Sequence, residues 1–111
     1  MIVAVDYGVS RCGLAVSFEQ KLAEPLTSVK TEKVFLKLKD LKPDLVVVGI
    51  SAGKSARLAK AFAKEVENVL GLKVVMVDES LTTMEAKQIT NKKDDDAIAA
   101  ALILERFLED V

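Results

Sequence analysis

Residues 1–18 read MIVAVDYGVSRCGLAVSF, and this opening stretch decides the fold. Residues 1–7 are rich in isoleucine, valine and alanine, which predicts a mostly buried strand. Gly8 and Gly13 bracket a polar turn of four residues, and residues 14–18 predict the returning strand. The stretch therefore predicts a β-hairpin whose loop is longer than two residues.

The remainder of the chain predicts further strands and then an alternation of helices and strands. Strands are expected over residues 26–29, 45–50 and 73–77, the last two buried, and helices from Thr31 and over 55–70, 82–89 and 95–108. The apolar face of the 55–70 helix is expected to comprise Leu58, Phe62, Val66, Val69 and Leu70, and Gly71 to cap it. This order predicts an α/β fold: a mixed five-stranded sheet, with a three-strand antiparallel meander followed by two parallel strands, flanked by helices. No linker or repeat interrupts the pattern, so residues 1–111 are predicted to form a single domain.

Composition excludes several classes of function. The 111 residues include no histidine and one cysteine, which rules out a Ser-His-Asp triad, an imidazole metal site and an intrachain disulfide. No apolar run approaches the roughly 20 residues of a membrane span, and no secretory signal opens the chain, so we expect a cytoplasmic protein that does not contact a membrane. A net charge of −1 argues against non-specific binding to a polyanion. Contact with nucleic acid would then require a local basic face or metal ions.

Acidic residues follow two of the predicted parallel strands. Asp6 ends the first strand, and Asp78 and Glu79 end the last. The carboxyl ends of parallel strands form the ligand-binding edge of an open α/β sheet, so we expect one carboxylate from each strand there. Asp78 and Glu79 alternate between opposite faces, and the pattern does not choose between them.

A third acidic group, residues 94–96, stands before the last predicted helix. An aspartate at a helix N-terminus is explained by capping, but three adjacent aspartates exceed that need. A divalent cation shared with Asp6 and a strand-end carboxylate would offset their repulsion, because hard cations prefer oxygen ligands. We therefore expect a magnesium-type carboxylate site, without choosing among the three aspartates.

Other residues carry weaker signals. Arg11 lies in the predicted loop near Asp6 and is the best candidate for a phosphate contact. Cys12 is expected to be a small apolar filler, since no histidine is present to activate it. Lys60 and Lys64 are four residues apart and are expected on an exposed helix face.

Four ordered motifs resemble those of the YqgF family, ribonuclease-H-like proteins also described as RuvX or Holliday junction resolvases. The first motif is Asp6-Tyr7-Gly8 with Arg11 and residues 13–17, and residues 47–49 resemble the central strand of the family. Residues 77–83 resemble its Asp-Glu-Arg-Leu-Thr-Thr signature, and residues 96–104 its closing helix. The resemblance spans nearly the whole chain and implies a ribonuclease-H-like sheet.

The resemblance also implies a function and its residues. Asp6, Glu79 and Asp96 match the three carboxylates that bind metal and catalyse, which selects Glu79 over Asp78 and Asp96 over its neighbours. Gly8, Arg11 and Thr83 are expected to contact substrate. The implied activity is hydrolysis of phosphodiester bonds with Mg²⁺ or Mn²⁺, expected as two ions. The implied role is maturation of the 5′ end of pre-16S rRNA in the cytoplasm, acting on that RNA or on a pre-ribosomal particle, as a monomer or weak dimer.

The chain departs from the family signature in ways that keep two alternatives open. Ser80 stands where the family has arginine, and the segments after Gly49 and between Thr83 and Asp96 are short. One alternative is therefore a nucleic-acid-binding module with weak activity. The other is a Holliday junction resolvase, which would need a dimer to present two sites to a four-way DNA junction. An actin-like ATPase is set aside, because it needs two such domains around the nucleotide.

Overall fold

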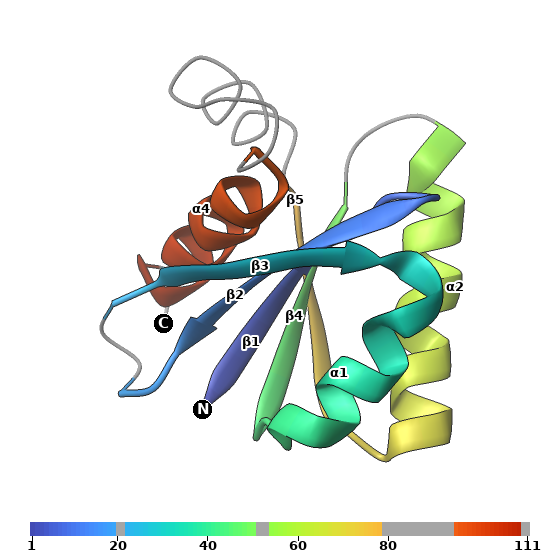
Figure 1. Cartoon of the computed structure of the whole chain (residues 1–111), viewed down its shortest axis with the longest axis horizontal. Helices are drawn as coiled ribbons and strands as arrows, with labels where there is room; N and C mark the ends of the chain where they lie inside the picture. Colours follow the sequence, from blue (N-terminus) through green and yellow to red (C-terminus); the bar gives the residue numbers. More distant parts are fainter. Residues whose placement is uncertain (20–21, 51–53, 79–94, 110–111) are drawn as a thin grey trace.

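One five-stranded sheet organises the protein (Figure 1). The computed structural model describes residues 1–19, 22–50, 54–78 and 95–109. Its spatial order is β3-β2-β1-β4-β5. The strands are β1 (Ile2–Asp6), β2 (Arg11–Ser17), β3 (Glu24–Lys30), β4 (Leu45–Ile50) and β5 (Val74–Asp78). The helices are the 3-10 turn η1 (Thr31–Lys33), α1 (Val34–Leu41), α2 (Lys54–Leu70) and α4 (Asp95–Glu109).

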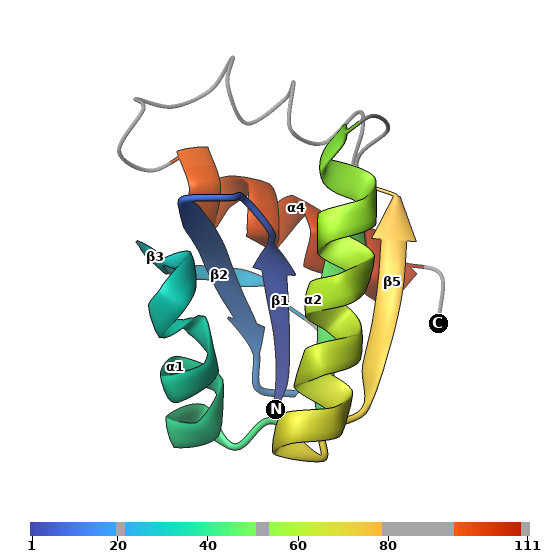
Figure 2. The same ribbon diagram turned by 90° about the vertical axis from the view of Figure 1, so that its right-hand side faces the viewer.

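The strand directions confirm the predicted mixed sheet. β1, β2 and β3 pair antiparallel as a meander, whereas β1 pairs parallel with β4, and β4 with β5. Figure 2 shows the arrowheads of β1 and β5 pointing to the same end of the molecule, which is also the end where α4 begins. This is the end at which open α/β sheets bind ligands.

Helices cover both faces of the sheet, α1 and α2 on one and α4 on the other (Figure 1). Strand alternation divides β1 between the two cores. Val3 and Val5 pack with buried residues of α1 and α2, while Ile2 and Ala4 pack with buried residues of α4. Asp6 continues the second series and therefore lies on the α4 side of the sheet.

The described helices largely match their predicted extents, but the apolar face predicted for α2 is partly wrong. Gly71 follows α2 at φ +66°, which confirms it as the left-handed cap of that helix. Phe62 and Val66 are buried as predicted, but Leu58 and Val69 are exposed. The small residues Ala59 and Ala63 are buried instead, in the same core cluster as Phe62 and Val66.

Two strand predictions also need correction. β2 begins at Arg11, so that residue lies in a strand rather than in the loop, and Gly13 lies within the strand. β5 was predicted to be buried, but Val75 and Met76 are 37% and 40% exposed because β5 is an edge of the sheet. The helix predicted over residues 82–89 lies outside the described residues.

Cys12, Lys60 and Lys64 behave as predicted, the thiol being buried and both lysines exposed. In the described part of the chain, no helix combines the length and the apolar character needed to cross a membrane.

Candidate metal and nucleic-acid site

Asp6 lies at the centre of a row of residues that crosses the sheet at its ligand-binding end. The strand registers pair Asp6 with Gly13 of β2 on one side and with Gly49 of β4 on the other. The row continues to Ser28 of β3 beyond Gly13, and to Val77 of β5 beyond Gly49. Asp6, whose side chain is half-buried, is therefore flanked by a glycine on each neighbouring strand.

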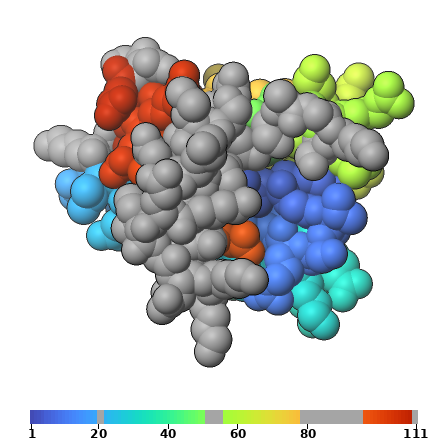
Figure 3. Space-filling model, turned by 90° about the horizontal axis from the view of Figure 1, so that it is seen from above, coloured from blue at the N-terminus to red at the C-terminus, as the bar shows by residue number. Residues whose placement is uncertain are grey.

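Gly13 brings the first turn of α4 onto the sheet. A Cβ atom added at Gly13 would overlap the backbone carbonyl of Asp96 and would lie 2.8 Å from the backbone nitrogen of Ala97. The helix therefore rests directly on the backbone of β2, beside the strand that ends in Asp6. Viewed from above, atoms at the start of α4 (orange) lie next to the N-terminal strands and their loop (blue) (Figure 3).

Burial and the charges of Asp6 and Asp96 all act on the pKa of the Cys12 thiol. Burial raises the pKa of Cys12 most, and the negative charges of Asp6 and Asp96 raise it further, against hydrogen bonds with Thr31 and Gly8 that lower it. Residues 6 and 96 are ninety positions apart in sequence. Together with the packing of Asp96 on Gly13, which pairs with Asp6, this shared effect on Cys12 puts two of the three predicted carboxylates in the same region.

Arg11 and Asp96 are joined through Ser28. The Arg11 guanidinium donates from Nε to the Ser28 hydroxyl and from Nη2 to the Ser28 carbonyl, each at 3.2 Å. The same hydroxyl donates to Oδ2 of Asp96 at 3.1 Å. Sequence reasoning missed Ser28, because no local motif marks it; only the register opposite Gly13 and the placement of α4 give it this position.

The loop between β1 and β2 is held in place by Thr31. Its hydroxyl donates to the Gly8 carbonyl at 2.6 Å, and its backbone N–H donates to the Ser10 carbonyl at 3.0 Å. A Cβ atom at Gly8 would overlap the carbonyl of Arg11, so closure of this loop requires glycine there. Tyr7 packs its ring 5.0 Å from that of Phe62 in α2. The loop that follows Asp6 is therefore held by hydrogen bonds from Thr31 and by the packing of Tyr7 on α2.

Two predicted site residues, Glu79 and Thr83, lie outside the described residues. Within residues 1–19, 22–50, 54–78 and 95–109, no three potential metal ligands are grouped. The described pair, Asp6 and Asp96, supplies carboxylate oxygens, which are the ligands that hard divalent cations prefer.

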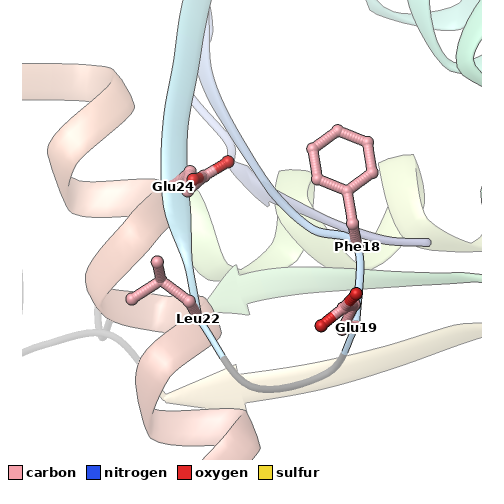
Figure 4. A pocket seen from close by; sticks show the side chains of 4 residues that line it. All are labelled: Phe18, Glu19, Leu22 and Glu24. Atoms are coloured by element: carbon pink, nitrogen blue, oxygen red, sulfur yellow. The ribbon is translucent and has the colours of Figure 1, made fainter.

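A cavity of about 190 Å³ lies at the opposite end of β2, where the chain turns towards β3. Figure 4 shows Phe18 and Glu19 on one side of this turn, and Leu22 and Glu24 on the other. The described charged side chains that line it, Glu19 and Glu24, are acidic. The carboxylate end of the sheet also presents the exposed cations Arg11 and Lys30 and is therefore the better candidate for nucleic acid.

Comparison with known sequences finds a resolvase family and proteins named as nucleases. A family model described as "RuvX: Holliday junction resolvase" matches residues 1–110. A protein of Albidiferax ferrireducens named "Putative pre-16S rRNA nuclease" is 34% identical, over 98% of this chain and 78% of its own length. A protein of Nitrosomonas eutropha with the same name is also 34% identical, over 97% of this chain and 83% of its own. That second alignment extends over 131 positions, so the relative carries segments that this 111-residue chain lacks.

Solved structures support the ribonuclease-H-like fold. The Fowlpox virus resolvase, solved with Holliday junction DNA, superposes with a TM-score of 0.63 at 14% identity, covering 98% of this chain and 97% of its own. RuvC of T. thermophilus, solved with a Holliday junction substrate, gives a TM-score of 0.61 at 17% identity, with the same coverage. At such low identity these similarities establish the fold alone.

Proposed function

The chain belongs to the RuvX family, and from that premise we propose that it is a divalent-metal-dependent endonuclease that hydrolyses phosphodiester bonds of pre-16S rRNA. The observation that carries this proposal is that the backbone of Asp96 packs against Gly13, the neighbour of Asp6 in the sheet, at the carboxyl end of the parallel strands. Sequence relatives about one third identical along nearly the whole chain bear the name of a pre-16S rRNA nuclease. This proposal places the protein in the cytoplasm, as a monomer or weak dimer.

Mg²⁺ or Mn²⁺ fits the residues present. Asp6 and Asp96 would hold the metal, and Glu79 is proposed as the third carboxylate because it occupies the matching position of the family signature. Val77, two residues before Glu79, packs on the α4 side of the sheet, which is also the side of Asp6. When bound, a pair of such ions would supply activation of a water molecule and stabilisation of the leaving oxygen.

The remaining residues of the site would bind and orient the phosphodiester. Arg11 is exposed and carries more donors than its two bonds to Ser28 use, so it can also contact a phosphate oxygen. Lys30 is exposed and lies directly opposite Arg11 in the register of β2 and β3. Like charges in directly opposed positions destabilise a sheet. An anion bound between Arg11 and Lys30 would offset their repulsion. Gly8 and Thr83 remain proposed substrate contacts on the motif match.

Cleavage assays with matched variants test the proposal. A fragment of the pre-16S rRNA 5′ leader is incubated with Mn²⁺, Mg²⁺ or EDTA, beside a four-way DNA junction. Wild type is compared with Asp6→Asn, Asp96→Asn and Glu79→Gln, and with Asp40→Asn as the control, because Asp40 is an exposed aspartate of α1. We expect metal-dependent cleavage of the RNA by wild type and Asp40→Asn and none by the three site variants. Full activity of Asp6→Asn or Asp96→Asn would refute the assigned site.

Two other results would select a different function. Resolution of DNA junctions is the second candidate, favoured by the description of the matching family. Cutting of the junction alone would establish it. Binding of RNA without cleavage of either substrate would instead establish a binding module, an outcome in keeping with the segments that this chain lacks relative to the Nitrosomonas protein.

A further inference from the structure

Ser28 stands between the two charged groups of the site. Its hydroxyl has one proton, which it donates to Oδ2 of Asp96, and lone pairs, one of which accepts the Nε–H of Arg11. The hydroxyl dipole is therefore aligned from a cation towards an anion, and both bonds involve a charged group. Arg11 is further held by the backbone carbonyl of Ser28, so its guanidinium is anchored at two points.

The hydroxyl links Arg11 and Asp96 without letting them form an ion pair. Within the described part of the chain, the ion pair found joins the N-terminal amine of Met1 to Asp44, far from this site. An arginine in direct contact with Asp96 would compete with a metal ion for the carboxylate oxygens and with phosphate for the guanidinium. The interposed hydroxyl leaves both groups in place and oriented for their separate ligands.

We propose that Ser28 is a positioning residue, which holds the Asp96 carboxylate in the orientation for metal binding and keeps the Arg11 guanidinium apart from it for phosphate. This inference rests on the proposed function, since it concerns the same carboxylate site. It adds a residue that neither binds the metal nor belongs to the family motifs quoted above. Hydrogen-bonding partners of metal ligands typically contribute a factor of about 10 to 100 in metal affinity.

Ser17 offers a matched control for the removal of a serine hydroxyl. It lies on the same strand face as Gly13, at the other end of β2, and pairs with Ile2. Its side chain is fully buried, and its hydroxyl has no hydrogen-bond partner among the described residues. Both Ser28→Ala and Ser17→Ala therefore remove a hydroxyl from the same side of the sheet. The hydroxyl of Ser28 has hydrogen-bond partners, whereas that of Ser17 has none among the described residues.

The test measures binding of Mn²⁺ alone by calorimetry, without nucleic acid, for wild type, Ser28→Ala, Ser28→Thr and Ser17→Ala. We expect the Kd for Mn²⁺ to rise about 10- to 100-fold in Ser28→Ala. Ser28→Thr retains the hydroxyl and is expected to stay within about threefold of wild type, as is Ser17→Ala. Thermal melting of each protein without metal shows whether a change in affinity reflects unfolding instead.

Three results would overturn the inference. Unchanged Mn²⁺ affinity in Ser28→Ala would show that the hydroxyl does not orient Asp96. A Ser28→Thr protein as weak as Ser28→Ala would assign the effect to side-chain size rather than to the hydroxyl. Absence of Mn²⁺ binding by wild type would refute the proposed metal site itself and this inference with it, a result distinct from the other two.

Discussion

Replacement of Gly13 by alanine tests whether the contact between β2 and α4 places Asp96. The new methyl group would overlap the carbonyl of Asp96 and lie 2.8 Å from the nitrogen of Ala97. Unstrained contacts of a carbon atom are about 3.5–4.0 Å, and the atoms in the way are backbone, so no side chain can rotate aside. The first turn of α4 must therefore move away from β2 by about 1.5–2 Å to clear the Asp96 carbonyl.

This displacement has two separate consequences. Overpacking of this kind costs about 1–3 kcal/mol of the free energy of unfolding. A shift of about 1 Å in a catalytic group typically lowers activity about 100-fold, which far exceeds the effect of a modest loss of stability on a protein that remains folded. We therefore expect Gly13→Ala to stay folded at 25 °C, with Mn²⁺ affinity and metal-dependent cleavage both strongly reduced.

Gly71→Ala is the matched control. Gly71 has φ +66°, and nothing lies within 4 Å of an added Cβ atom. Alanine in this left-handed conformation costs roughly 1–2 kcal/mol, which is similar to the stability loss expected for Gly13→Ala. Urea unfolding, Mn²⁺ calorimetry and cleavage kinetics are measured for both variants. If Gly13→Ala matches Gly71→Ala in metal affinity and cleavage rate, the close packing at Gly13 does not position Asp96 and the reasoning is refuted.

Three further predictions concern Arg11, Ser17 and Cys12. Arg11→Ala should weaken nucleic-acid binding and reduce the salt slope of log K by about 1, and an unchanged slope would remove Arg11 from the phosphate contacts. Ser17→Ala should leave the free energy of unfolding unchanged or raise it, because the buried hydroxyl has no described partner; a clear loss would reveal one. The pKa of Cys12 is raised by burial, so its contribution to stability is complete below the ordinary thiol pKa of about 8.5 and is lost as pH rises through the raised value. Between a pH of about 8.5 and that raised value, urea midpoints should fall more steeply for wild type than for Cys12→Ser, and parallel curves would contradict the shift.

The extents of most elements could be predicted from local sequence. The apolar run at residues 45–50 coincides with β4, and Gly71 ends α2 as its position indicates. The errors occurred where tertiary neighbours decide. Gly13 was placed at a turn because glycine is common in turns, but it lies within β2, where α4 requires the absence of a side chain. β5 was predicted to be buried because its residues are apolar, yet its position at the sheet edge leaves Val75 and Met76 partly exposed.

The candidate site shows the same division. By itself the sequence determined the mixed sheet, the acidic residues at its ligand-binding end and the family, because strand periodicity, strand order and ordered motifs are local or linear properties. Only the tertiary structure decided that Asp6 stands between two glycines, that α4 places Asp96 against β2, and that Ser28 joins Arg11 to Asp96. Those relations depend on strand register and on helix packing between residues far apart in the chain, and no local pattern of residues encodes them.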